Sequence, residues 1–313
     1  RLVWRKNPSP PGTSSMFKQR LGPRQRPAIG VNFRKAGILM KKAAFIGVGN
    51  MGGALARAAC RALGPEEVVL ANRTPAKAEA LGLELGCAAA CSGGEAVRAA
   101  EYIFLGVKPQ GMGALLEELS PVIRACHEAG EDKVLVSMAA GLRLDDLRGR
   151  LGEAGYGVPL LRIMPNTCAA IGRGMTALCA REGEDEAHVR RVEEILSATG
   201  RVERIPEGLM DQFSAVAGCG PAFVYPFIEA LADGGVMAGL PRAQAVEYAA
   251  QMVLGAAAMV LETGKHPGAL KDEVCSPGGS TIAGVAELER DGLRSAAMDA
   301  VMASWRRSME LGK

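Results

Sequence analysis

The feature that most constrains this chain is a glycine-rich segment between a short apolar run and an alanine-rich run. Residues 43–53 read AAFIGVGNMGG, and the residues that follow have the pattern of a helix. A second apolar run, EVVLA at 67–71, completes a strand–helix–strand pattern, which is the context in which a GxGxxG fingerprint binds a dinucleotide. A glycine turn without a ligand is the alternative, because a chain with 40 glycines produces near-matches by chance.

Each glycine of the fingerprint has its own predicted task. Gly47 permits the tight turn after the strand, Gly49 lets a pyrophosphate approach the backbone, and Gly52 lets the helix pack on the strand. The helix N-terminus offers unpaired N–H groups to the anion. We therefore predict a cofactor site formed by Gly47, Gly49, Asn50, Met51 and Gly52.

The end of the second strand indicates which dinucleotide is bound. About 20 residues after the last glycine, where an NAD site has an acidic residue, this chain has Asn72, Arg73 and Thr74. All three can donate hydrogen bonds to a 2′-phosphate, which an acid would repel. We expect NADPH as the cofactor, with NADH as a possible substitute. An ordinary solvated loop arginine is the alternative interpretation of Arg73.

Strand–helix alternation continues to about residue 205. The further strand candidates are EYIFLGV (101–107), KVLVSMA (133–139) and PLLRIM (159–164). Nearly continuous apolar strands that alternate with helices are typical of a parallel sheet covered on both faces. The fold class predicted for this part is therefore α/β, with an N-terminal Rossmann dinucleotide-binding domain.

The loops that close the next two strands should lie at the edge of the sheet where cofactors bind. The first of these loops contains Val107, Lys108 and Pro109, and the second contains Ala139 and Ala140. Small residues in the second loop would let a nicotinamide lie close to the backbone. We predict that all five residues contact the cofactor, although Lys108 could be a plain surface charge.

The last third of the chain has a different pattern. Residues 209–233, 242–263 and 280–312 are long helical stretches rich in Ala, Gly and Met. These stretches are apolar around much of their circumference, and so small a helical unit could hardly bury them alone. We predict an all-α C-terminal dimerisation domain and a homo-oligomer.

Charge divides the chain into three predicted parts. Residues 1–40 carry nine Lys/Arg and no acid, and are expected to be a disordered or non-native leader, with a processed targeting segment as the alternative. Residues 41–205 form the NADP-binding domain, and residues 206–313 form the helical domain for dimerisation and substrate binding. From residue 41 onward 28 Lys/Arg face 34 Asp/Glu, so no nucleic-acid partner is expected.

Composition also bears on metals, membranes and location. The eight cysteines are scattered without a CxxC, which favours free thiols in a reducing compartment, and we expect a cytoplasmic protein. The three histidines pair with no cysteine at metal-ligand spacing, so no metal site is predicted. The most apolar helix candidate contains Glu247 and Gln251, and no membrane association is expected.

A second distinctive segment, DEVCSPGGSTIAG at 272–284, leads into a predicted helix. Free N–H groups at the helix start, with Ser and Thr hydroxyls in reach, could bind a small carboxylate. A Ser/Thr helix cap after a glycine turn is the alternative.

Five motifs in order, FIGVGNMG, GVKP, LLRIMPNT, AGCGPAF and DEVCSPGGSTIAGV, resemble pyrroline-5-carboxylate reductase from about residue 42 to residue 311. The resemblance implies NADPH-dependent reduction of 1-pyrroline-5-carboxylate to L-proline, the last step of proline biosynthesis. It also implies a homodimer that can assemble further, into a decamer, and an active site that borrows residues from the partner subunit.

The same resemblance carries over the substrate loop, whose backbone N–H and hydroxyl groups would hold the substrate carboxylate. Thr281 matches the threonine near the ring nitrogen and is the expected catalytic residue. The substrate-binding residues implied are Val274, Ser276, Gly278, Gly279 and Ser280.

Other functions remain open on the sequence. A related NADP-dependent imine or hydroxyacid oxidoreductase is one, but the hydroxyacid enzymes need a lysine on a helix that here, over 210–233, has none. A non-enzymatic NADP(H)-binding regulator is the other, and it would not need the SPGGST segment.

Overall fold

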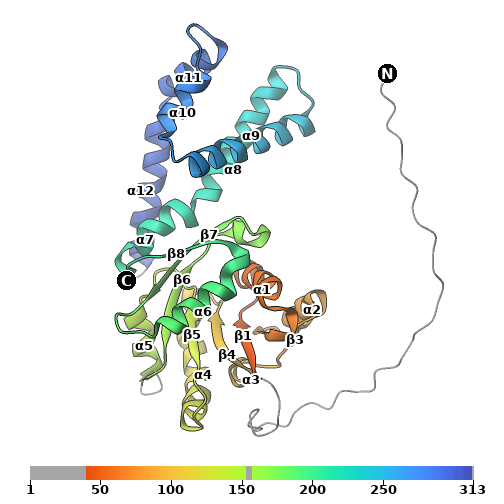
Figure 1. Cartoon of the computed structure of the whole chain (residues 1–313), viewed down its shortest axis with the longest axis vertical. Coiled ribbons are helices and arrows are strands. Elements are labelled where there is room, and N and C mark those ends of the chain that lie inside the picture. The colour runs from red at the N-terminus through yellow and green to blue at the C-terminus, as the bar shows by residue number, and fades with distance from the viewer. Residues whose placement is uncertain (1–39, 153–156, 312–313) are drawn as a thin grey trace, which may run out of the picture. The chain divides into compact units, whose positions relative to one another are not determined.

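The computed structural model describes residues 40–152 and 157–311, and the predicted leader lies outside the described residues except for Met40. Within the described residues, eight strands form one sheet in the order β3-β2-β1-β4-β5-β6-β7-β8 (Figure 1). The strands are β1 (Lys41–Ile46), β2 (Val68–Ala71), β3 (Ala88–Ala89), β4 (Ala100–Leu105), β5 (Val134–Ser137), β6 (Leu160–Met164), β7 (Gly174–Ala180) and β8 (Gly200–Arg204).

The sheet is parallel from β3 to β6, as predicted. Ile46 pairs with Leu105, and Leu105 pairs with Ser137, so the carboxyl ends of β1, β4 and β5 meet at one edge. Strand β7 then runs antiparallel to β6, which the sequence analysis did not predict. The physical reason is that residues 165–173 are too few for a crossover connection, which needs about a dozen residues.

Helices cover both faces of the sheet. One buried cluster packs residues of α3, α4 and α5 on one face, and a second cluster packs residues of α1, α2 and α6 on the other. The predicted α/β class with covered parallel strands is thereby confirmed. The helices are α1 (Asn50–Leu63), α2 (Pro75–Leu85), α3 (Gly93–Ala99), α4 (Pro109–Glu128), α5 (Leu144–Leu151) and α6 (Glu186–Leu196).

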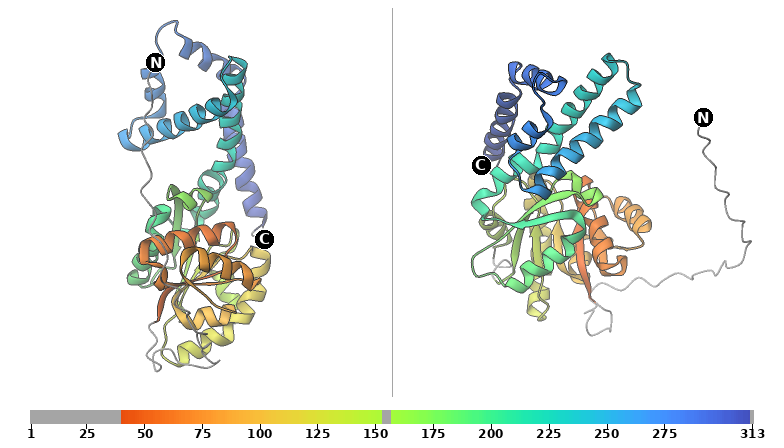
Figure 2. Two further views of the ribbon diagram at one scale, coloured as in Figure 1. Left: turned by 90° about the vertical axis from the view of Figure 1, so that its right-hand side faces the viewer. Right: turned by 45° about the horizontal axis from the view of Figure 1, so that its top comes forward.

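The helical region after β8 contains no strand among its described residues (Figure 1). A 3₁₀ turn at Glu207–Leu209 and a short helix α7 (Met210–Phe213) lead into a π-helical turn at Ser214–Gly218. Helices α8 and α9 then pack side by side as a hairpin (Figures 1 and 2). The remaining helices are α8 (Gly220–Met237), α9 (Arg242–Thr263), α10 (Pro267–Val274), α11 (Ser280–Arg290) and α12 (Leu293–Leu311).

The helical region leaves much of its apolar surface exposed. Its own small cluster of buried residues consists of Ala232, Ala245 and Ala249. Large side chains along the same hairpin are exposed, including Tyr248 and Met252. Two helical stretches, Glu207–Met237 and Arg242–Thr263, are long and apolar enough to span a membrane by length and composition, but helices that pack on a second copy of the chain can have the same composition.

Candidate cofactor and substrate sites

The glycine loop after β1 is held by close backbone packing. Gly47 has a φ of 96°, and a Cβ added to it would lie 2.7 Å from the carbonyl carbon of Gly106. A Cβ on Gly52 would lie 2.0 Å from the carbonyl oxygen of Gly47. These two glycines are therefore required by the approach of the β1 loop, the β4 loop and helix α1, as the sequence predicts for Gly47 and Gly52.

Gly49 differs from its two neighbours in the fingerprint. A Cβ on Gly49 would have no atom within 4 Å, so the loop is open on this side. Gly49 is the N-cap of α1, no side chain caps this helix end, and its first turn contains no acid. The N-terminus of α1, with Asn50 and Met51, thus presents backbone N–H groups and a positive dipole end to an anion.

The loop after β2 has two kinds of residue. The Asn72 side chain faces the glycine loop, since its Oδ1 accepts a hydrogen bond from the Val48 N–H at 3.2 Å and its Nδ2 donates to the Thr74 carbonyl at 3.1 Å. Arg73 and Thr74 are exposed. The structure therefore shows Asn72 holding the loop, and leaves Arg73 and Thr74 available to a ligand.

The loop after β4 lies beside the glycine loop, and the loop after β5 lies beside the end of β4. The N–H of Gly106 donates to the Ile46 carbonyl at 2.7 Å, and the N–H of Met138 donates to the Leu105 carbonyl at 3.4 Å. In the first loop, Val107 is half-buried, Lys108 is the exposed N-cap of α4 and Pro109 is the first residue of that helix.

In the β5 loop, only one of the two predicted alanines is accessible. Ala139 is 1% exposed, and its N–H donates to the Ser137 hydroxyl at 3.3 Å, whereas Ala140 is exposed. The Ala139 methyl group therefore belongs to the core. A cofactor at this edge could meet Ala140 directly.

The predicted substrate loop joins α10 to α11. Val274 ends α10, Gly278 has a φ of 66°, and the Gly279 N–H donates to the Ser276 carbonyl at 3.1 Å. Ser280 and Thr281 are the first two residues of α11, and both are exposed. The N-cap is Gly279, without a side-chain hydrogen bond, so none of these hydroxyls serves as the helix cap that the alternative interpretation required.

The two sets of predicted residues are not joined within one chain. Among residues 40–152 and 157–311, no hydrogen bond or ion pair links the 274–281 loop to the loops at the carboxyl edge of the sheet. Within the described residues, the candidate cofactor site and the candidate substrate loop therefore share no direct polar contact.

One polar residue at the sheet edge, Asn166, lies in the LLRIMPNT motif and has no predicted role. Asn166, 8% exposed, follows β6. Its Nδ2 donates to the Ala217 carbonyl at 2.9 Å, and its Oδ1 accepts from the Met175 N–H at 3.3 Å. Asn166 thereby fastens the π-helical turn to the carboxyl edge of β6. A Pro-Asn pair just after the apolar end of a strand was the available signal.

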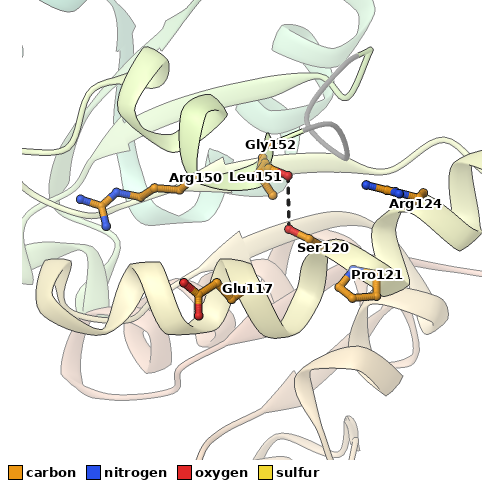
Figure 3. Close-up of a pocket in the computed structure, with 7 residues that line it drawn as sticks. All are labelled: Glu117, Ser120, Pro121, Arg124, Arg150, Leu151 and Gly152. Atoms are coloured by element: carbon orange, nitrogen blue, oxygen red, sulfur yellow. Dashed lines mark hydrogen bonds between the residues drawn. The ribbon is translucent and has the colours of Figure 1, made fainter.

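A cavity lies away from all the predicted residues. It has a volume of about 480 Å³ and is lined by residues of α4 and by the end of α5, including Glu117 and Arg150 (Figure 3). The Ser120 hydroxyl there donates to the Leu151 carbonyl at 3.5 Å. None of the motif residues lines this cavity, so it has no part in the candidate site. No group of three or more metal-ligating side chains occurs among the described residues.

Two family models match the chain. The model described as NADP oxidoreductase coenzyme F420-dependent matches residues 42–141, and the model described as pyrroline-5-carboxylate reductase dimerisation matches residues 207–311. Pyrroline-5-carboxylate reductase of Pisum sativum is 39% identical over 269 residues, which cover 85% of this chain and 94% of the relative. The Escherichia coli enzyme is 40% identical over 87% of this chain and 99% of its own. The chain belongs to the pyrroline-5-carboxylate reductase family.

Solved structures agree with this membership. A Plasmodium falciparum pyrroline carboxylate reductase with NADP bound has a TM-score of 0.77 and 29% identity, covering 87% of this chain and 98% of that one. Family membership confirms the predicted resemblance, the Rossmann-like N-terminal part and the helical dimerisation domain. The individual site residues stay predictions.

Proposed function

We propose that this protein reduces 1-pyrroline-5-carboxylate to L-proline with NADPH, the last step of proline biosynthesis. The observation that carries the proposal is that pyrroline-5-carboxylate reductases 39–40% identical to the chain match it over both the sheet and the helical region. The enzyme is an NAD(P)-dependent oxidoreductase that acts on a carbon–nitrogen bond.

The residues present fit a bound NADPH. The open side of Gly49 and the uncapped start of α1 suit a pyrophosphate, and the N–H groups of Asn50 and Met51 would face it. Arg73 and Thr74 would contact the 2′-phosphate, while Asn72 would hold the loop. Val107, Lys108, Pro109 and Ala140 would line the nicotinamide end, together with the backbone at Ala139. When bound, NADPH supplies the hydride that the reaction requires.

The 274–281 loop would hold the substrate carboxylate with the N–H groups of Gly278 and Ser280 and with the Ser276 hydroxyl, while the Gly279 N–H closes the turn on the Ser276 carbonyl. Val274 would pack against the ring. The protonated imine is already a good hydride acceptor, so the protein mainly has to align donor and acceptor. Thr281 would hydrogen-bond the ring nitrogen and orient the imine. A threonine hydroxyl is a poor proton donor near neutral pH, so this role is one of orientation.

We further propose the finer assignments that follow from this function. The chain would form a homodimer through the helical region, then a decamer, with each site made from a cofactor edge of one chain and a substrate loop of its partner. The domain boundary would fall between residues 205 and 206, after a leader at 1–40. The enzyme would act in the cytoplasm, without a nucleic-acid or membrane partner.

The test is NADPH oxidation by the purified full chain with 1-pyrroline-5-carboxylate, measured beside NADH and beside a six-membered cyclic imine carboxylate. We expect fastest turnover with NADPH and the five-membered ring. Faster turnover of the six-membered ring would indicate a general imine reductase. Tight NADPH binding without turnover of either imine would contradict the proposal in favour of a regulator.

A further inference from the structure

Three segments that are far apart in the sequence meet at a charged contact between a buried arginine and a partly exposed glutamate. The Nη1 of Arg162, on β6, lies 3.3 Å from the Oε1 of Glu207, which begins the 3₁₀ turn before α7. The same carboxylate oxygen accepts a hydrogen bond from the Leu144 N–H at 2.7 Å. We call this contact the 162–207 bridge. It joins a central strand, the start of the helical region and the first residue of α5.

Burying the charged Arg162 side chain of this bridge costs desolvation free energy. Arg162 is 2% exposed, and its Nε and Nη2 have no hydrogen-bond partner among the described residues. On the neighbouring strand, burial and the nearby Glu207 raise the pKa of the Cys179 thiol to about 12. A buried guanidinium with so few partners contributes less to folding than an apolar side chain of similar size. A role other than stability therefore explains the charge better.

The hydrogen bond from Leu144 to Glu207 indicates a positioning role for the bridge. Leu144 directly follows the loop at 138–143 that closes β5 and contains Ala140. As the first residue of α5, Leu144 has an N–H without an intrahelical partner, and the Glu207 carboxylate accepts its hydrogen bond. Because Glu207 leads directly into α7 and α8, its carboxylate fixes the 138–143 loop against the start of the helical region.

We infer that Arg162 and Glu207 are positioning residues for hydride transfer. Arg162 holds the Glu207 carboxylate in place, and Glu207 sets the distance between the 138–143 loop and the helical region. The inference rests on the proposed function, in which that loop faces the nicotinamide and the dimer formed through the helical region brings the partner's substrate loop to it. Neither residue touches the reacting atoms. A shift of about 1 Å in such a spacing is enough to slow a reaction about 100-fold.

The main experiment compares Glu207→Ala with Glu207→Gln in the full chain. Glu207→Ala should lower kcat about tenfold or more, leave the Kd for NADPH within about twofold, and raise the isotope effect with NADPH deuterated at the transferred position. Glu207→Gln keeps an oxygen that can accept from Leu144 and should recover part of the loss. Arg162→Met, which fills the space without charge, should resemble Glu207→Ala.

A matched control lies at the other edge of the sheet. Lys133, which precedes β5, forms a buried ion pair with Glu131 at 3.4 Å and donates to the Ala100 carbonyl at 2.9 Å. Glu131→Ala should lower the melting temperature while kcat and the isotope effect stay at wild-type values below the transition. The inference is overturned if Glu207→Ala keeps wild-type kcat and isotope effect, or changes only the melting temperature as the control does.

Nicotinamide fluorescence separates failure of this inference from failure of the proposed function. If the wild-type chain binds NADPH but reduces no imine, the proposed function fails, and the bridge is then tested by the emission of bound NADPH alone. Glu207→Ala should change the emission yield of bound nicotinamide at an unchanged Kd, and Glu131→Ala should not. An emission yield equal to that of the wild type overturns the inference.

Discussion

The sheet region and the helical region of this chain differ in what each can bury by itself. Both faces of the sheet are covered by helices of the same chain, and strands such as β2 and β6 are buried along their whole length. In the helical region, Tyr248, Met252 and Leu254 on α9 stay exposed. The sheet region is therefore complete in one chain, whereas the helical region needs a second copy to cover its apolar surface.

The largest effect should come from the packed side of the glycine loop. Gly52→Val places a Cβ about 2.0 Å from the Gly47 carbonyl oxygen, a backbone atom that cannot move aside. We expect a loss of about 3 kcal/mol or more in the free energy of unfolding, measured with urea. Gly49→Ala is the control, because its Cβ meets no atom within 4 Å. Gly49→Ala should keep the wild-type stability and weaken NADPH binding. Equal stability losses in both variants would contradict this packing.

The second prediction concerns the exposed face of α9. Met252→Glu puts a charge on the surface that a partner chain should cover, so we expect the oligomer to dissociate in sedimentation experiments. Leu83→Glu is the matched control, since Leu83 on α2 is 88% exposed in the sheet region. It should leave the oligomer intact. An unchanged oligomer in the Met252→Glu variant would show that α9 faces solvent.

A smaller effect is expected in the substrate loop. Thr281→Ala should lower kcat by roughly tenfold to a hundredfold, the value of one or two hydrogen bonds in the transition state. Thr281 is exposed at the start of α11 and caps no helix, so NADPH binding and stability should not change. Steady-state kinetics and a fluorescence titration check both parts. Unchanged turnover would remove Thr281 from the site.

The smallest effect should be a change in cofactor preference. Arg73→Ala should weaken NADPH binding by about tenfold and change NADH binding very little, since only NADPH carries the 2′-phosphate. Lys77→Ala is the control, because Lys77 is also exposed and lies just inside α2. Titration of each variant with both cofactors gives the ratio. Equal losses for the two cofactors in Arg73→Ala would mean that the 2′-phosphate is bound elsewhere.

What the sequence could predict follows from the range of the interactions. The parallel sheet and the tasks of Gly47 and Gly52 depend on local periodicity and on steric limits that a short segment reveals. The apolar circumference of α9 likewise indicated a surface for another chain. Family resemblance supplied the substrate loop, whose local pattern alone also fits a helix cap.

The rest depended on contacts between distant residues. The antiparallel direction of β7 follows from its short connection to β6. The structural role of Asn72 in holding the glycine loop follows from its hydrogen bond with the Val48 N–H. The Ala139 methyl group is buried because it packs into the hydrophobic cluster on one face of the sheet. Arg162 and Glu207 are 45 residues apart in the sequence, and no local sequence pattern predicts that they pair.

The most direct test of a site made from two chains uses two inactive variants in one oligomer. Gly49→Glu places an acid where the pyrophosphate would bind, and Ser280→Glu places one where the substrate carboxylate would bind, at a helix start that tolerates acids. Each variant alone should be inactive. When the two variants are co-expressed, about half of the randomly paired dimers are mixed, and each mixed dimer keeps one of its two sites with both halves intact. About a quarter of wild-type turnover should therefore return. No recovery in mixed dimers would contradict the account and place both halves of the site in one chain.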